Sequence, residues 1–181
     1  NETGIEDKLP LINSLYGYAG PSVAITENIP AWQLKNSYAV PDGVFEWVRK
    51  KYPSAKYLHQ HSVSLMNLKP SSENGKLLVD FRPGEFQVTA ERHNKFLFAR
   101  AFEYETPEDV LFYLLKLCEQ FGLAPKDVFV ELSGLIEKES SLYKELYQYF
   151  IHIDFRDAGW GVANDYPAHF FTSFNDMIQC G

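Results

Sequence analysis

The chain has 181 residues, 45% of them hydrophobic and 15% aromatic, so it can bury a substantial core and is not an intrinsically disordered protein. A net charge of −7 argues against a continuous basic surface, and we expect no nucleic-acid partner. No apolar run approaches the roughly 20 residues of a membrane-spanning helix, and no secretory signal is visible. We therefore expect no membrane partner and a cytoplasmic location.

The two cysteines, Cys118 and Cys180, lie far apart and outside any Cys-x-x-Cys spacing. A disulfide framework needs more thiols in a closer pattern. We therefore predict two reduced thiols, as is usual in a cytosolic protein.

The first part of the chain carries mixed signals. Residues 1–30 have scattered glycine and proline and no firm period, so we expect a loosely organised segment. Ser37–Val40 predicts a short strand. A helix is predicted from Asp42, with apolar residues at helical spacing, until Pro53 ends it. Tyr57–Val63 is predicted as a second strand.

The turn-rich run Lys69–Gly75 is the predicted domain boundary. Beyond it, apolar and polar residues alternate, as in strands that bury one face. The pattern predicts a three-stranded meander with turns at Pro83–Gly84 and His93–Asn94 and with strands at Leu77–Phe81, Glu85–Glu91 and Lys95–Tyr104.

A helix start is visible at Thr106, where a capping threonine precedes a proline and two acidic residues. The helix has an apolar stripe and ends at Gly122. The remaining predicted elements are a strand at Asp127–Leu132, a helix at Glu139–Tyr149, a strand at Ile151–Phe155 and a closing helix within Pro167–Cys180.

The order of these elements is β-β-β-α-β-α-β. Strands interleaved with helices predict a mixed sheet covered by helices, in the α/β (α+β) class. The order is similar to one half of the fold shared by actin, the Hsp70 chaperones and sugar kinases.

Several stretches resemble domain-of-unknown-function family 3822, a bacterial family. The main ones are GKLLVDFRPGEF, FARAFEYETPEDVLFYLL and VFVELSGLIEKESSLYKELYQYF. Upstream, YAVPDGVFEWVRKKYPSAKYLHQHS is similar to the mid-region of the family, and PAHFFTSFNDMIQC resembles its end. The likeness covers residues 35–181.

This resemblance implies a degenerate two-domain actin-like ATPase fold of ribonuclease H-like architecture, with no established activity. It implies that residues 1–70 are the C-terminal remnant of a first actin-like domain and that residues 71–181 are the second. Members of the family are usually longer at the N-terminus. We therefore expect the rest of the first domain, with any phosphate loop, upstream of Asn1.

Asp80 is the candidate for a catalytic carboxylate, because the second domain of actin-like ATPases begins with an Asp-x-Gly turn that approaches phosphate and metal-bound water. Here Arg82 stands where the glycine should be, Pro83 has no amide to donate, and Gly84 comes two residues late. Nucleotide hydrolysis is therefore not expected at this turn. Under the alternative, Asp80, Arg82 and Gly84 bind the nucleotide.

Ser133 and Gly134 fall where such ATPases keep a Gly-Gly pair near the adenosine, and they are further nucleotide-binding candidates under the alternative. A tight turn after a strand also accounts for a single glycine there, and it is the favoured interpretation. We expect no cofactor, and ATP with Mg²⁺ belongs to the nucleotide-binding alternative alone.

Two histidines, His59 and His61, are spaced to share one face of the predicted strand, which makes them candidate metal ligands. No third ligand is evident nearby, so we expect no metal there. Asp154 and Arg156 share a face of the last strand, with Asp157 beside them. We expect a surface ion pair at that position.

Motifs for phosphate binding such as GxGxxG and GxxxxGK[ST] are absent. Tyr143, Tyr147 and Tyr149, and the run His169–Phe171, are candidates for an exposed adhesive patch. We therefore predict a catalytically inactive scaffold or protein-binding module with a protein partner. A nucleotide-binding or ATP-hydrolysing protein is the alternative, and a small-molecule sensor that uses an interdomain crevice is a third option.

Overall fold

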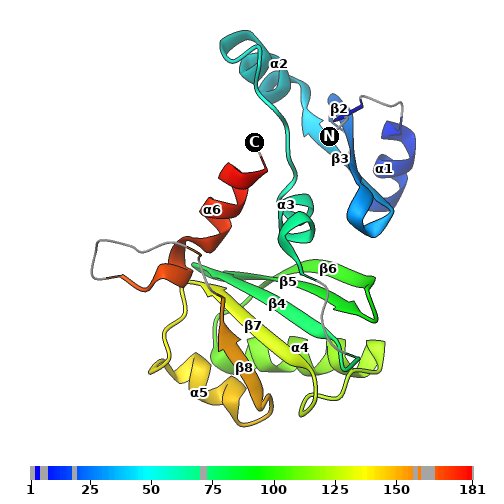
Figure 1. Ribbon diagram of the computed structural model, residues 1–181. Coiled ribbons are helices and arrows are strands. Elements are labelled where there is room, and N and C mark those ends of the chain that lie inside the picture. Colours follow the sequence, from blue (N-terminus) through cyan, green and yellow to red (C-terminus); the bar gives the residue numbers. More distant parts are fainter. Residues whose placement is uncertain are drawn as a thin grey trace. The chain divides into compact units, whose positions relative to one another are not determined.

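The computed structural model describes residues 3–4, 8–17, 20–69, 73–156, 159 and 166–180. The chain divides into two compact units, Asn1–Met66 and Asn67–Cys180. Each unit has its own β-sheet (Figure 1). None of the helices within the described ranges is long and apolar enough to cross a membrane.

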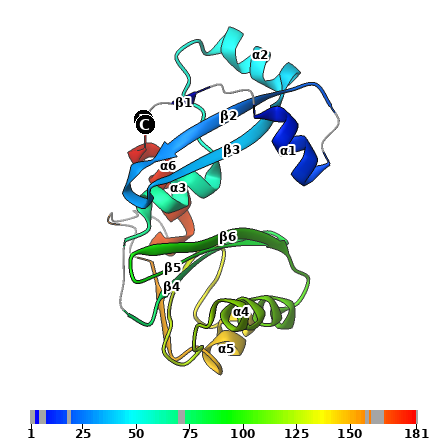
Figure 2. The ribbon, with the colours of Figure 1, turned by 90° about the vertical axis from the view of Figure 1, so that its right-hand side faces the viewer.

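The first unit is built on an antiparallel sheet with the strand order β1-β2-β3. Its elements are β1 (Thr3–Gly4), α1 (Leu9–Tyr16), β2 (Ser22–Ile29), the 3-10 turn η1 (Pro30–Trp32), β3 (Leu34–Pro41), α2 (Asp42–Lys51) and α3 (Gln60–Asn67). β2 and β3 pair along their whole length, from Ser22 opposite Pro41 to Ile29 opposite Leu34. α1 and α3 lie on opposite faces of this hairpin (Figures 1 and 2).

The predictions for this unit are confirmed at β3 and α2 and wrong before them. The segment expected to be loose contains helix α1 and the eight-residue strand β2. β2 is the central strand of its sheet, and it buries polar Thr26 and Glu27 together with apolar residues on both faces. Alternation is therefore missing from its sequence, which is why the strand was not predicted.

The strand predicted at Tyr57–Val63 is also wrong, because helix α3 begins at Gln60. His59 is the N-cap residue of this helix, and both its backbone and its side chain accept hydrogen bonds from the first turn. Its carbonyl accepts a hydrogen bond of 3.1 Å from the Val63 N–H, and its ring Nδ1 accepts one of 3.1 Å from the His61 N–H. Histidine is not among the preferred capping residues, so the start of the helix is not visible in the sequence.

The second unit contains a five-stranded mixed sheet with the order β6-β5-β4-β7-β8. β4 pairs antiparallel with β5 and parallel with β7, while β5–β6 is antiparallel and β7–β8 parallel. The predicted β-β-β-α-β-α-β order is confirmed, with small differences in bounds. The elements are β4 (Lys76–Arg82), β5 (Glu85–Arg92), β6 (Lys95–Glu103), α4 (Pro107–Phe121), β7 (Phe129–Gly134), α5 (Ser141–Tyr147), β8 (His152–Phe155), η2 (Ala168–Phe171) and α6 (Thr172–Gln179).

The two faces of this sheet have different chemistry. α4 and α5 lie on one side of it and α6 on the other (Figures 1 and 2). Leu77, Val79 and Phe81 of β4 belong to the apolar core that also contains residues of α4 and α5. Because side chains alternate along a strand, Lys76 and Asp80 point to the opposite face. The polar residues of β4 therefore lie on the side of α6.

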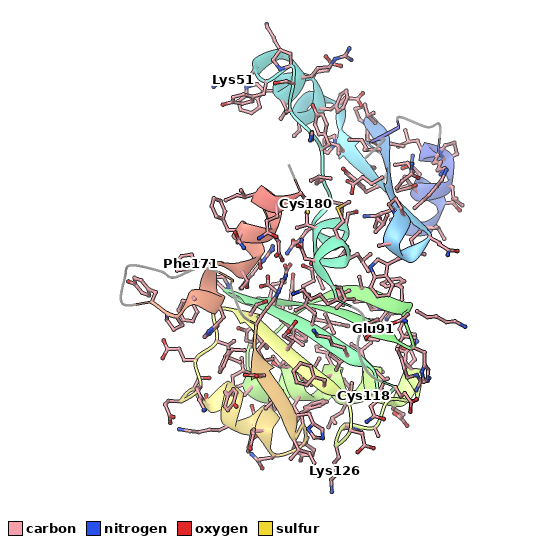
Figure 3. All side chains as sticks on the ribbon, viewed as in Figure 1. Lys51, Glu91, Cys118, Lys126, Phe171 and Cys180 are labelled. Carbon is pink, nitrogen blue, oxygen red and sulfur yellow. The ribbon has the colours of Figure 1, made fainter. Side chains whose placement is uncertain are left out.

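The two cysteines lie at separate places in the second unit, Cys118 in α4 and Cys180 after α6 (Figure 3). Both are free thiols, as predicted. Burial raises the pKa of Cys118 to about 12, so this thiol stays protonated and unreactive at neutral pH.

Candidate functional site

Two of the residues predicted at a nucleotide cleft meet on neighbouring parallel strands. Asp80 of β4 lies opposite Ser133 of β7. The Ser133 hydroxyl donates a hydrogen bond of 2.8 Å to Asp80 Oδ1. Only 8% of Asp80 is exposed, so this contact is shielded from water.

Two further groups complete the surroundings of the Asp80 carboxylate. Ser173 Oγ, from α6, donates to the same Oδ1 at 2.5 Å. Arg82 Nε lies 3.6 Å from Oδ2. Oδ1 of Asp80 thus accepts two hydroxyl hydrogen bonds from the chain itself, and Oδ2 has a cation nearby, which reduces the capacity of the carboxylate to bind a metal ion or a metal-bound water.

Gly134 is required by the packing of two strands. Its φ is +77°, and a Cβ on this residue would lie 2.1 Å from the Phe81 carbonyl oxygen. The N–H of the next residue, Leu135, donates to that same carbonyl at 2.9 Å. The glycine therefore lets β7 leave the sheet tightly against β4, and this contact accounts for it without a ligand.

The Pro83–Gly84 turn is a tight two-residue connection. Arg82 and Glu85 pair as the last rung of the β4–β5 hairpin. Gly84 has a φ of +70°, and its carbonyl accepts a hydrogen bond of 3.0 Å from the Tyr104 N–H at the end of β6. Because proline has no N–H, the turn itself has one amide donor, whereas a phosphate-binding loop presents several.

A hollow of about 680 Å³ beside this turn is acidic. Its lining includes four carboxylates, Glu85, Glu103, Glu105 and Asp109. Among the described residues that line it there is no lysine or arginine. Like charges repel, so this side of the hairpin disfavours a phosphate group.

Two more carboxylates lie on the α6 side of the sheet, half-buried Glu131 and buried Asp176, each with a cation. Lys76 Nζ lies 3.0 Å from Glu131 Oε2. Arg156 holds Asp176 through two bonds, with Nη1 at 2.5 Å from Oδ2 and Nη2 at 2.8 Å from Oδ1. Together with Asp80 and Arg82, three carboxylates are matched by three cations. We call Asp80, Glu131, Asp176, Lys76, Arg82 and Arg156 the charge-paired cluster.

Asp176 is the carboxyl most affected by this environment. Burial raises the pKa of Asp176 above its ordinary value, and the negative charges of Asp80 and Glu131 add to the rise. The two hydrogen bonds and the positive charge of Arg156 act in the opposite direction. Arg156 therefore lowers the cost of burying this carboxylate.

A polar cavity of about 220 Å³ lies among these ion pairs. Lys76, Glu131, Arg156 and Asp176 line it, as does Lys69. Four of these side chains form the two ion pairs, so the lining has three cations against two carboxylates and one positive charge in excess.

The structure also places the two candidate metal ligands, His59 and His61, and the predicted ion pair of Asp154 with Arg156. His59 and His61 do not share a strand, although their rings lie 5.0 Å apart. The described ranges contain no group of three or more residues able to hold a metal ion. The expected pair of Asp154 with Arg156 is wrong, because Arg156 bonds Asp176 and Asp154 Oδ1 accepts from the Phe155 N–H at 2.8 Å. Asp157 lies outside the described residues.

The aromatic candidates do not form one exposed patch. Tyr143 is buried, and its ring stacks on Phe155 at 5.4 Å, while Tyr147 and Tyr149 are exposed. His169 is half-buried and stacks on Phe155 at 4.2 Å.

Sequence reasoning missed Ser173, Asp176, Lys76 and Glu131. One signal for the α6 residues was available. Thr172, Ser173 and Asp176 recur at helical spacing, so they form a polar stripe that α6 turns inward. The sequence around Lys76 and Glu131 does not indicate that the two residues pair, because β4 and β7 are far apart in the chain and become neighbours only when it folds.

The model of a family described as "protein of unknown function (DUF3822)" matches residues 21–153. The chain belongs to this family. The predicted resemblance is thus confirmed. No curated protein matches the chain.

The fold of this DUF3822 member is similar to that of a solved structure. The solved structure is that of a protein from Bacteroides thetaiotaomicron with an actin-like ATPase fold and unknown function. It is similar to 97% of this chain with a TM-score of 0.77 at 16% sequence identity, and the chain spans 66% of that protein. The predicted actin-like ATPase fold is therefore confirmed. The assignment of residues 1–70 and 71–181 to two actin-like domains stays a prediction.

Proposed function

We propose that this DUF3822 protein is a catalytically inactive member of the actin-like ATPase fold that acts as a protein-binding module or scaffold. The observation that carries the proposal is the state of Asp80. Ser133, Ser173 and Arg82 surround its carboxylate, and the turn that follows it has neither the glycine position nor the amides of a phosphate loop.

The energetics of the charge-paired cluster support the same conclusion. Mg²⁺ binds to oxygen ligands and requires free carboxylate lone pairs. Here a metal ion would have to displace hydroxyl or cationic partners from carboxylates that are already buried. Breaking a buried ion pair by removing one partner costs about 3–5 kcal/mol, so the cluster resists conversion into a metal site.

Exposed apolar side chains support the protein-binding part of the proposal. α6 buries Thr172 and Asp176, while Phe174 and Ile178 are 63% and 65% exposed. An amphipathic helix normally buries its apolar face, and α6 does the reverse. Large apolar residues gathered on an exposed helix face are typical of surfaces that bind other proteins.

A second candidate is nucleotide binding without hydrolysis. The observation that favours it is that Asp80 and the Ser133–Gly134 corner come together, as the alternative requires. The pairing of the carboxylate and the acidic hollow beside the turn weigh against it. For the protein-binding proposal we place the protein in the bacterial cytoplasm, without a cofactor.

Titration calorimetry with Mg-ATP separates the two candidates. We expect neither heat of binding nor phosphate release from the wild-type chain, and the same result for Asp80→Asn, which keeps the shape and hydrogen bonds of the side chain. Tight binding that Asp80→Asn weakens by about tenfold or more would establish the nucleotide-binding alternative instead. Arg100→Met is the control for a lost surface charge, because Arg100 is exposed on β6.

A further inference from the structure

The backbone of β3 presents hydrogen-bonding groups on its outer side. The Asp42 N–H donates to the Pro21 carbonyl at 3.1 Å, just beyond the last β2–β3 pair. Bonded and non-bonded positions alternate along an antiparallel pair, so the backbone of Pro41 faces away from β2. Ser37 and Ala39 have the same parity as Pro41. Their N–H and C=O groups therefore point to the outer edge.

This edge is open within the part of the chain that the structure describes. β3 is the last strand of its sheet and pairs there with β2 alone. Its eight residues include one charged side chain, Lys35. The edge strand β6 of the second unit carries three, Lys95, Arg100 and Glu103. Charges on an edge strand discourage pairing with another chain, so β3 is the less protected of the two.

A hollow of about 360 Å³ lies at this edge. One wall is formed by Ile12 and Tyr16 of α1, and another by Tyr38 and His59. Ser37 and Ala39 also line it, although their side chains lie on the opposite face of the sheet from Tyr38. Since α1 and α3 lie on opposite faces of the hairpin (Figure 2), a hollow with walls from both faces must surround the edge of β3.

The charge around the hollow selects against an acidic ligand. Glu27 is 1% exposed, and its Oε1 accepts a hydrogen bond of 2.6 Å from the His59 N–H. Burial and the negative charge of Glu27 raise the pKa of Tyr38, which lines the hollow. Among the described residues of the lining there is no lysine or arginine. The chain as a whole has a net charge of −7.

We infer that the outer edge of β3 binds an extended, non-acidic segment of a partner protein by strand addition. The segment pairs its backbone with Ser37 and Ala39 and places apolar or basic side chains against Tyr16 and Tyr38. Main-chain pairing supplies affinity in this mode of recognition, and the flanking pockets supply specificity. The inference rests on the proposed protein-binding function and names its partner class.

The exposed apolar residues of α1 continue this surface. Leu11, Leu15 and Tyr16 are all exposed, while Ile12 of the same helix is buried. Tyr16 also lines the hollow. An added strand would thus cover part of the apolar face of α1 and would bury surface there as well as form backbone hydrogen bonds.

The test uses the full chain and a displayed library of random dodecapeptides. Peptides selected on the wild-type chain are synthesised, and their affinities are measured for wild type, Ala39→Pro and Ala101→Pro. Ala39→Pro removes the outward N–H without breaking the β2 ladder, and the strand already accommodates Pro41 at a position of the same parity. Ala101→Pro is the matched control. The Tyr104 N–H bond to Gly84 gives Ala101 the same outward parity on edge strand β6.

We expect Ala39→Pro to weaken binding by about tenfold or more, since it removes a backbone hydrogen bond and the close approach of a strand, and Ala101→Pro to leave binding unchanged. Hydrogen exchange should show new protection of the Ser37 and Ala39 amides when peptide is bound. Methylation of alternate amides of the peptide should abolish binding, a result that needs no change in the protein.

Other outcomes overturn strand addition. Peptides that bind wild type and both proline variants alike would show another binding surface, and the protein-binding proposal would survive. If the library yields no peptide that prefers wild type over Ala39→Pro, strand addition at β3 is wrong, while the protein-binding proposal still stands. A concentration-dependent dimer that Ala39→Pro abolishes would assign the edge to a second copy of the chain.

Discussion

Asp80 shows how a buried carboxylate near the end of a strand can be satisfied by groups of the chain itself. It lies beside Ser133 on adjoining strands. Hydroxyl donors from β7 and α6 and the Arg82 guanidinium of β4 surround its carboxylate. Glu131 and Asp176, on the same side of the sheet, are paired with Lys76 and Arg156. At this scale the α6 side of the sheet is a set of matched charges, and removing one member of its most buried pair, Arg156–Asp176, leaves the other with the cost of burial uncompensated.

Arg156→Met tests this argument. Removing the guanidinium leaves the Asp176 carboxylate buried without its cation, so we expect the free energy of unfolding to fall by about 3 kcal/mol at neutral pH. The pKa of Asp176 is already raised in the folded state, and the substitution raises it further. A raised folded-state carboxyl pKa destabilises the folded state fully above the raised value, and the effect disappears as the pH falls toward the unfolded-state pKa. The loss caused by the substitution should therefore shrink as the pH falls from the raised pKa of the variant toward that of the wild type.

Denaturant unfolding at neutral and mildly acidic pH, with Arg100→Met as the exposed control, measures this effect. A loss that is equal at both pH values would mean that Arg156 acts through packing rather than through the charge of Asp176.

The site residues that could be predicted from the sequence are those with a local signal. Asp80 ends an apolar strand, and Ser133–Gly134 follows another. Both signals place these residues near the ends of the neighbouring strands β4 and β7, and whether they form a nucleotide site stays a prediction. Arg156 was assigned to Asp154 because the two are close in sequence, but it bonds Asp176 on α6. Contacts between elements far apart in the chain depend on topology, which local patterns do not contain.

At the scale of elements, α4 shows a sequence prediction that is confirmed in detail. Thr106 accepts a hydrogen bond from the Asp109 N–H, and the Asp109 side chain accepts one from the Thr106 N–H, which completes a capping box. Gly122 ends the helix in the left-handed conformation. The same type of reasoning failed for β2 and α3. β2 buries polar residues in a central strand, and His59 caps α3 with an uncommon side chain.

Thr106→Ala should lower the free energy of unfolding by about 1 kcal/mol, because one of the orphan amides at the start of α4 loses its acceptor. Hydrogen bonds from the backbone of Thr106 and Glu105 and from the Thr106 hydroxyl lower the pKa of Asp109. The variant should therefore raise that pKa toward its ordinary value. Unfolding curves and NMR titration measure the two effects. Ser14→Ala, on an exposed position of α1, should leave both unchanged.

At the scale of the whole molecule, the proposed function depends on the surface that the chain would present to a partner. The structural match gives the chain an actin-like ATPase fold, but a fold alone does not determine activity. Helix α6 contributes Asp176 to the charge-paired cluster and also carries an exposed apolar face. The helix turns its polar residues inward to complete the cluster, and its apolar residues are left exposed. The proposed loss of catalysis and the proposed gain of a binding surface thus have one structural cause.

The double substitution Phe174→Ser and Ile178→Ser tests this link. Both side chains are exposed, so we expect the stability and the Arg156–Asp176 pair to be unchanged, whereas capture of native partners by the full chain should fall by about tenfold, as is usual when apolar anchors leave an interface. Phe112→Ser, which removes a similarly exposed ring from α4, is the control. Quantitative mass spectrometry of the captured proteins gives the measurement. If both variants keep the same partners as wild type, α6 is not the binding surface, and its apolar face needs another explanation.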